Sequence, residues 1–421
     1  MNSPQPEAWK HHFVPRSLLK YFRPPGDDEY LYTFDKQTGK SYRTAIENAG
    51  SRNGFNTFKQ GELTVNFEQD FDAVDALLAK RLREIHEVTS VAALSSAQRH
   101  DWDDLVAVQL VRTPIARSTF TNFAADLGKQ LKEKFGIEFG GELPSENDAK
   151  KAARANFLER ERLRKHLATK DLVLFEAPAG SPFQISDRPV VLQSSLPFGD
   201  GGLSSVGVAI LMPLGQRLML GMYCPSIRHK LNTVLLEKLE LPEGVAARLT
   251  ALREGLNTGA LVKVDSEIVE KHNQQQTIAC MRFVYGPNNN FTNARALVAA
   301  HPEIREVRSS IRVGEFGRGP GPRAQMPLGS WLTLVGRAGA HMLEVYDVIC
   351  ETPFEVRVVS EAALAQAMRD RPFSEMRLYV EKHEQRGMRN VNLIPIKRES
   401  GLSVQVRHAD PFLDVLMSRI K

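Results

Sequence analysis

The sequence predicts an α+β fold in which a mainly helical N-terminal half packs on a small mixed sheet and a smaller α+β domain follows. The chain has 421 residues, more than one hydrophobic core usually holds, so we expect at least two cores. Between residues 67 and 85 apolar side chains recur at intervals of three and four, which indicates an amphipathic helix. After residue 170 the pattern changes to short apolar runs bounded by glycine and proline, which is typical of strands.

The first half of the chain opens with a predicted hairpin and continues as helices. Residues 30–34 alternate in polarity and are followed by a turn-forming cluster at 35–39. A second helix is expected after Ser95 and Ser96, which can cap it, until Pro114 disturbs it. Further helices are expected over 120–135 and, after a polar break, over 148–168.

The middle of the chain is predicted to form the sheet and the helices that cover it. Expected strands cover residues 172–175, 183–192, 206–212, 218–223 and 281–285. Expected helices cover residues 227–239, 244–256 and 266–279.

A stretch rich in glycine, proline and arginine predicts a domain boundary. It contains Gly317-Arg318-Gly319-Pro320-Gly321-Pro322-Arg323, which disfavours the interior of helices and strands. We therefore expect a first domain at 1–308, a linker or loop at 309–329 and a small α+β domain at 330–421. Expected strands of that last domain cover 331–335, 342–349, 354–359, 376–380 and 391–396, with a helix at 361–369.

The composition restricts the class of protein. Apolar residues make up 42% and charged residues 25%, as in globular proteins. The longest apolar stretch, 206–214, is too short to span a membrane, and the first ten residues lack the apolar core of a secretory signal, so we expect a cytoplasmic protein without a membrane partner. Three scattered cysteines give neither a disulfide framework nor a zinc pattern, and a net charge of +5 permits nucleic acid as a partner without requiring it.

The densest group of functional side chains lies near the N-terminus. His11 and His12 precede Pro15 and Arg16. A histidine titrates near neutrality and can transfer a proton, while an arginine binds carboxylate or phosphate. The alternative is that His12 and Arg16 bind neighbouring carbonyl groups in a docked N-terminal segment.

Two further motifs carry polar residues on apolar elements. Gln109 and Arg112 lie three residues apart and therefore share one helix face, where Arg112 either binds substrate or pairs with a carboxylate such as Glu68 or Asp75. Asp187 follows an expected strand and precedes Arg188 and Pro189. It is a candidate metal ligand, general base or partner of His12, or else it caps a turn.

These motifs, in this order, resemble one bacterial family, known as domain of unknown function 4238, over about residues 10–290. The resembling elements are His12-Phe13-Val14-Pro15-Arg16 with Leu19-Lys20 and Phe22, residues 31–36, Glu68, Gln109-Leu110-Val111-Arg112-Thr113-Pro114, Ile185-Ser186-Asp187-Arg188-Pro189-Val190 and Met212-Pro213-Leu214. Arg188 stands where the family more often has asparagine, and Asp75 where it has a second glutamate. The resemblance implies a gene found among phage-defence genes and supplies no chemistry.

The leading hypothesis combines two inferences. The resemblance implies an antiviral defence protein, and the residues favour hydrolysis of phosphodiesters in nucleic acid or nucleotides, because a histidine, arginines and an acid are the groups that phosphoryl transfer uses. The alternative is a non-catalytic sensor of a phage product or nucleotide, and the C-terminal domain is a candidate surface for a phage-encoded trigger or a protein partner. A divalent metal cofactor is compatible with either. The expected catalytic residues are His12 and Asp187, the substrate-binding residues Arg16, Gln109, Arg112 and Arg188, and the supporting residues His11 and Glu68. We expect His12→Ala and Asp187→Ala to abolish activity while the fold survives.

Overall fold

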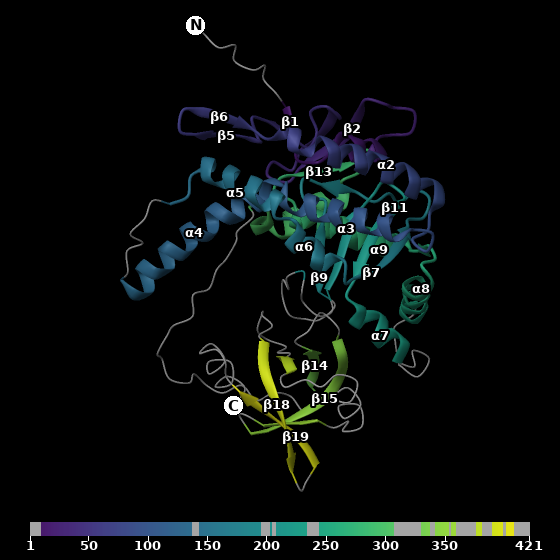
Figure 1. Cartoon of the computed structure of the whole chain (residues 1–421). Helices are drawn as coiled ribbons and strands as arrows, with labels where there is room; N and C mark the ends of the chain where they lie inside the picture. Colours follow the sequence, from purple (N-terminus) through teal and green to yellow (C-terminus); the bar gives the residue numbers. More distant parts are fainter. Residues whose placement is uncertain are drawn as a thin grey trace.

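The computed structural model describes residues 10–136, 143–194, 203, 208–233 and 244–306, together with six strands between residues 330 and 407. As predicted, the fold is α+β (Figure 1). The helices are α1 (Arg16–Leu19), η1 (Lys20–Phe22), η2 (Glu68–Phe71), α2 (Asp72–Val88), α3 (Ser96–Val111), α4 (Pro114–Phe135), α5 (Glu146–Leu158), α6 (Glu161–Leu167), α7 (Pro225–Thr233), α8 (Val245–Thr258), α9 (Ser266–Ala279), α10 (Thr292–Ala300) and η4 (Pro302–Arg305). The strands up to residue 306 are β1 (Lys10–His12), β2 (Tyr30–Asp35), β3 (Ser41–Ala45), β4 (Ser51–Asn53), β5 (Thr57–Gln60), β6 (Leu63–Asn66), β7 (Asp171–Glu176), β8 (Ile185–Ser186), β9 (Val191–Ser194), β10 (Val208–Pro213), β11 (Leu218–Tyr223), β12 (Val262–Lys263) and β13 (Phe283–Gly286).

A five-stranded sheet forms the centre of the part that carries the motifs. Its strand order is β12-β7-β11-β10-β9, and every pair is antiparallel except β12 with β7. All residues of β10 are buried, so this strand is covered on both faces and reads as one continuous apolar run in the sequence. At Gly221 of β11, a Cβ atom would lie 2.8 Å from the ring of Phe175, which explains a glycine inside this strand.

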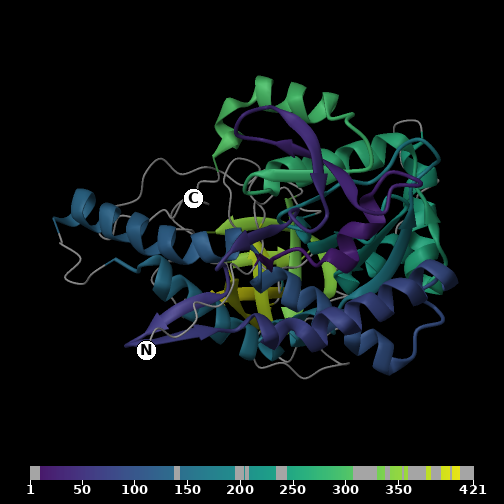
Figure 2. The ribbon, with the colours of Figure 1, turned by 90° about the horizontal axis from the view of Figure 1, so that it is seen from above.

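A second sheet brings together segments that are far apart in the sequence. Its order is β3-β2-β13-β8, and β13 pairs with both β2 and β8. Figure 2 shows the purple strands of the N-terminal part beside the green segment that contains α9 and α10. The loop after β8, which carries Asp187, therefore lies next to the start of β13.

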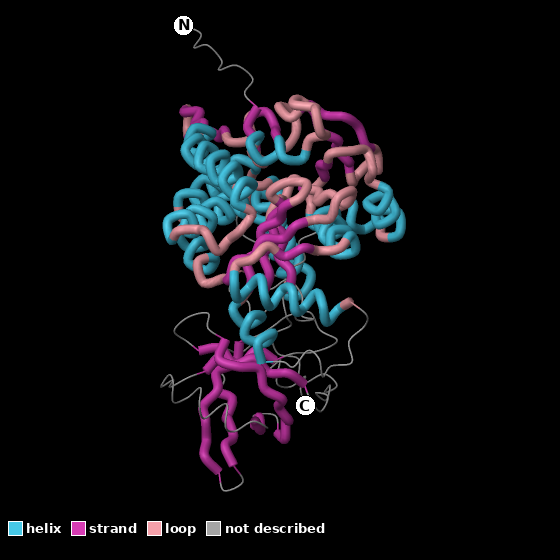
Figure 3. Tube along the Cα trace, turned by 90° about the vertical axis from the view of Figure 1, so that its right-hand side faces the viewer, coloured by secondary structure: helices cyan, strands magenta, loops and turns pink. Residues whose placement is uncertain are grey.

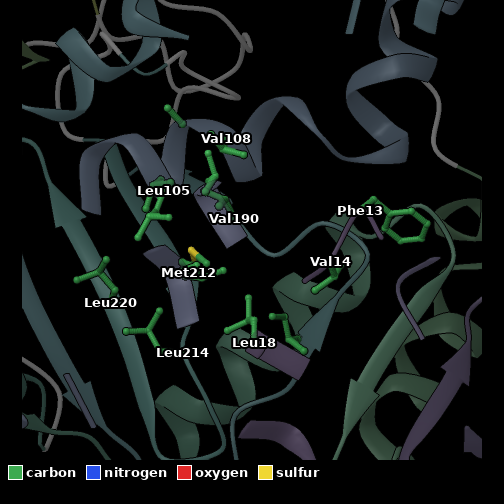
Figure 4. Packing of buried hydrophobic residues seen from close by; sticks show 14 of the residues in the cluster. Phe13, Val14, Leu18, Leu105, Val108, Val190, Met212, Leu214 and Leu220 are labelled. Atoms are coloured by element: carbon green, nitrogen blue, oxygen red, sulfur yellow. The ribbon is translucent and has the colours of Figure 1, made fainter. Parts of the chain in front are cut away.

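The main hydrophobic core joins the N-terminal motif to the five-stranded sheet. Figure 4 shows Val14 and Leu18 on the same core as Leu105 of α3 and Met212 of β10. These side chains are almost fully buried, and burying such a side chain contributes about 1.5 to 3 kcal/mol. The segment that contains His12 is thus anchored by apolar residues on its C-terminal side.

Most expected helices and strands are confirmed, with their ends set by local chemistry. Ser95 caps α3, because its hydroxyl accepts a hydrogen bond from the backbone of Gln98, whose side chain accepts one from the backbone of Ser95. Pro114 occupies the first position of α4, where its missing N–H costs nothing. The helix α10 and the strand β19 were missing from the sequence-based prediction.

The expected continuous strand over 183–192 is wrong. The structure has β8 and β9 in two different sheets instead. Side chains of α9 hold the chain on both sides of β8: Asn273 accepts a hydrogen bond from the backbone N–H of Gln184, just before β8 (2.8 Å), and Gln276 donates one to the carbonyl of Pro189, between β8 and β9 (3.1 Å). These side-chain bonds take the place of the hydrogen bonds between paired strands. The sequence shows only an apolar run here, so it could not reveal that the segment is not one continuous strand.

The last six described strands form a closed antiparallel barrel, seen as magenta tubes in Figure 3. They are β14 (Ser330–Gly336), β15 (Met342–Thr352), β16 (Glu355–Val358), β17 (Met376–Val380), β18 (Asn390–Arg398) and β19 (Gly401–Arg407), in the order β14-β15-β16-β19-β18-β17. The helix expected at 361–369 and the linker expected at 309–329 lie outside the described residues, so the division of the chain there stays a prediction. Among the described helices, none combines the length and the apolar character needed to cross a membrane.

Candidate functional site

The two histidines of the N-terminal motif lie on β1 and point in opposite directions. β1 pairs with β4, with His11 opposite Arg52 and His12 opposite Ser51, and successive side chains of a strand alternate between its faces. The His11 side chain is buried, and its Nδ1 accepts a hydrogen bond from the backbone N–H of Asn56 (2.7 Å). Burial lowers the pKa of His11 to about 4, so this ring is an uncharged internal group.

His12 is only partly buried and has an oriented ring. Its Nε2 lies 3.1 Å from the carbonyl oxygen of Glu47. Because a carbonyl can only accept, Nε2 carries the hydrogen and the lone pair of the neutral ring is on Nδ1. Burial and the charge of the exposed Arg16, in that order, lower the pKa of His12 to about 4, so the ring is uncharged at neutral pH.

Arg112 fixes the backbone of β1 to two helices. The side chain is 1% exposed; Nη1 donates to Oδ1 of Asp75 (2.5 Å), and Nη2 donates to Oδ2 of Asp75 (3.3 Å) and to the carbonyl of His12 (2.5 Å). Its guanidinium carbon lies 4.4 Å from the centre of the Phe71 ring. The structure joins Arg112 to His12 through this backbone carbonyl. The contacts of Arg112 are those of the alternative interpretation, an ion pair with Asp75, rather than of a side chain open to substrate.

Glu68 supports the same segment from η2. One carboxylate oxygen accepts a hydrogen bond from the backbone N–H of His12 (3.2 Å), and the other accepts one from the side-chain amide of Asn56. Burial raises the pKa of Glu68, opposed mainly by the hydrogen bond from Asn56. Asn56 also accepts a hydrogen bond from Arg117, so a continuous polar network encloses β1.

Gln109 lies one turn before Arg112 on α3 and is buried. Its Oε1 has no hydrogen-bond partner within the described ranges. The structure thus shows a buried amide one turn before Arg112, the residue that follows α3.

Asp187 is 2% exposed and binds three consecutive backbone N–H groups at the start of β13. Oδ1 accepts from Met281 (2.7 Å), and Oδ2 accepts from Arg282 (2.7 Å) and Phe283 (2.9 Å). Burial raises the pKa of Asp187, opposed by these three hydrogen bonds and then by the charge of the buried Lys36. Asp187 therefore caps the N–H groups of the distant residues 281–283, which differs from the local turn cap considered from the sequence.

The structure does not join Asp187 to His12 by direct contacts. The hydrogen bonds of the Asp187 carboxylate go to residues 281–283, whereas those of His12 go to Glu47, Glu68, Arg112 and β4. Arg188, next to Asp187, is partly buried, and its backbone N–H and carbonyl are both bonded to the hydroxyl of Ser186. The expected composite site is therefore divided between two clusters.

Sequence reasoning missed Asn56 and Lys36, which complete these two clusters. The side chain of Lys36 is fully buried and donates to the carbonyl groups of Ile278 (3.2 Å) and Cys280 (2.5 Å). Both residues lie in turn-like sequence, where Asn and Lys are usually exposed, so only their tertiary partners identify them. Within the described residues, no group of three or more His, Cys, Asp and Glu side chains is arranged to hold a metal ion.

Comparison with known proteins identifies a family. No curated protein and no solved structure is significantly similar to the chain. The family model DUF4238, described as a protein of unknown function, matches residues 10–290, which is more than half of the 421 residues. This range includes β1, the Arg112 network and the Asp187 cap, and the chain therefore belongs to the DUF4238 family.

Proposed function

We propose that this chain is a hydrolytic effector of antiviral defence that acts on phosphodiesters in nucleic acid or nucleotides, with His12 as general base and Arg16 as the phosphate-binding group. The observation that carries the proposal is the His12 ring, which is partly exposed, uncharged and oriented by the carbonyl of Glu47 beside an exposed arginine. A general base needs an available lone pair at neutral pH and a fixed direction. His12 meets both requirements.

A bound phosphate would make His12 a stronger base. The charge of Arg16 is the second cause of the low pKa of His12. An anion on Arg16 offsets that charge and so raises the pKa of His12 toward neutrality, where general bases are most effective. Substrate binding and activation of the base are therefore coupled through one arginine.

The remaining motif residues have supporting roles in this proposal. Arg112 and Glu68 bind the backbone carbonyl and N–H of His12, so they position the strand that carries the base. Asp187 maintains the fold around β13 and does not contact the substrate. The antiviral setting is supported by the family resemblance, which implies genes found among phage-defence genes.

Activity assays with matched variants test the proposal. Purified protein is incubated with labelled RNA, DNA and nucleotides, with and without divalent metal, and the variants His12→Ala and Arg16→Ala are expected to lose at least about 100-fold in rate. His86→Ala is the control for His12, because His86 Nε2 also lies 3.1 Å from a carbonyl, that of Leu214, and burial lowers its pKa as well. Arg162→Ala is the control for Arg16, since the Arg162 side chain is 79% exposed.

The antiviral part is tested in cells. Bacteria that express the chain are challenged with a panel of phages, and protection should be lost with His12→Ala and retained with His86→Ala. Equal protection by both variants would reject the role of His12.

A binding module is the second candidate. Arg112 and Asp187 are buried and bind groups of the protein itself, so His12 and Arg16 are the members of the motif that face a ligand. A neutral imidazole and a guanidinium can bind an anion without cleaving it. Calorimetric binding of the same nucleotides, lost in Arg16→Ala and without any turnover, would favour this function.

A further inference from the structure

We propose that Ser51 is the nucleophile of this site and that His12 activates it. This inference rests on the proposed function, because it names the group that attacks the phosphorus. It stands on the pairing of β1 with β4 and on the turn that both side chains face.

The register of the two strands places the side chains together. His12 is directly opposite Ser51 in the antiparallel pair. Residues opposite one another in such a pair project from the same face, with Cβ atoms about 4.5 to 5.5 Å apart. This separation allows a serine hydroxyl and an imidazole nitrogen to reach one another.

Both side chains also converge on one turn. The hydroxyl of Ser51 donates to the carbonyl of Asn48 (2.9 Å), and Nε2 of His12 donates to the carbonyl of Glu47 (3.1 Å). Because these carbonyl groups belong to consecutive residues, the two side chains share their surroundings. Ser51 is partly exposed, and the ammonium group of Lys10, two residues before His12, lies 3.7 Å from the carboxylate of Glu47.

The arrangement has the three parts of an activated nucleophile. A hydroxyl lies beside a base, and a third group orients the base. Here the carbonyl of Glu47 holds Nε2, which leaves the lone pair on Nδ1 for the hydroxyl proton. A change of the Ser51 side-chain rotamer redirects its hydrogen from Asn48 to His12, and such contacts are often loose before substrate binds.

The reaction is balanced without a further reactant except water. Oγ of Ser51 forms a bond to phosphorus as the bond from phosphorus to the leaving alkoxide breaks. His12 accepts the hydroxyl proton and gives it to that alkoxide, while Arg16 binds the non-bridging oxygens. Water then attacks the phosphorus of this serine phosphodiester, and the bond from phosphorus to Oγ breaks. His12 accepts a proton from the water and gives it to Oγ, which releases a phosphate monoester and restores Ser51.

Two other serine hydroxyls, in or next to the family motifs, are poorer candidates. The Ser17 hydroxyl, next to Arg16, is buried without a partner among the described residues. The Ser186 hydroxyl is buried and donates to Gln276 (2.6 Å). Ser17 therefore provides a control, because it directly follows Arg16 but its hydroxyl is not accessible.

A covalent probe tests Ser51 independently of the natural substrate. The full chain is treated with a fluorophosphonate, which phosphonylates activated serines, and the modified peptide is identified by mass spectrometry. We expect modification of Ser51 in the wild type, at least a tenfold slower reaction in His12→Ala, and unchanged reaction in Ser17→Ala and His86→Ala. Circular dichroism checks that each variant is folded. Modification of Ser51 in the wild type tests the proposal even if a variant does not fold.

The phosphodiesterase assay of the same variants separates the two proposals. The role of Ser51 is overturned if cleavage persists in Ser51→Ala or if the probe does not modify the wild type. In either case the proposed function is still supported by any cleavage that is lost in His12→Ala. Modification of Ser51 that depends on His12, without cleavage of any phosphodiester, supports the nucleophile and rejects the substrate class. Neither modification nor cleavage overturns both.

Discussion

The replacement Asp187→Ala should destabilise the protein strongly. The carboxylate accepts hydrogen bonds from three part-buried backbone N–H groups, at 2.7, 2.7 and 2.9 Å. Leaving one buried donor without a partner costs about 1 to 3 kcal/mol, and the lower end of that range, which suits part-buried donors, gives about 3 kcal/mol for the three. The variant also removes the negative charge that attracts the buried Lys36. The sequence alone led us to expect a fold that survives this change, and the burial of Asp187 reverses that expectation.

Thermal and urea unfolding followed by circular dichroism measure this loss. A loss of 3 kcal/mol corresponds to a decrease in melting temperature of at least roughly 6 °C for a domain of this size. Asp27→Ala is the matched control, because Asp27 also accepts two backbone N–H groups but its side chain is 20% exposed, and it should shift the melting temperature much less. A melting temperature of Asp187→Ala within about 2 °C of the wild type would refute the reasoning, since it would mean that water or a rearranged backbone satisfies these donors.

Three further predictions follow from the same contacts. Arg112→Ala should destabilise the protein by about 3 kcal/mol, the lower end for a broken buried pair because Asp75 is partly exposed; urea unfolding should show Arg112→Lys in between, and an unchanged midpoint for Arg112→Ala would contradict this. The pKa values of His12 and His272 are about 4 and about 3 in the folded chain, against an ordinary value of 6.5. The unfolded chain therefore binds protons first, and stability that is present above pH 6.5 should be lost as the pH falls toward 4; a urea midpoint that stays constant from pH 7 to pH 5 would contradict this. Limited proteolysis should cut within residues 309–329, and protection of that stretch would contradict the predicted division of the chain.

Residue chemistry and periodicity predicted the elements around the candidate site but not how they meet. The intervals of three and four between apolar residues located α2, and the serine before the next stripe located α3. The same reasoning placed His12, Arg112 and Asp187 in one site because each motif held a polar group without an obvious partner. In the structure, Arg112 donates hydrogen bonds to Asp75 and to the carbonyl of His12. The carboxylate of Asp187 accepts hydrogen bonds from three backbone N–H groups. A sequence motif cannot identify a backbone group as the partner of a side chain, because every residue carries the same backbone groups.

By itself, the sequence determined most of the helical and extended segments, though not the break within 183–192, and the motifs that the chain shares with its family, because periodicity and local capping act over a few residues. Only the tertiary structure decided which partner each polar group has. The pairing of β1 with β4 sets Ser51 opposite His12, and the pairing of β13 with β8 brings Asp187 to residues 281–283. These contacts depend on which strands pair and in which register, and that is selected by burial of the whole core rather than by the residues that meet.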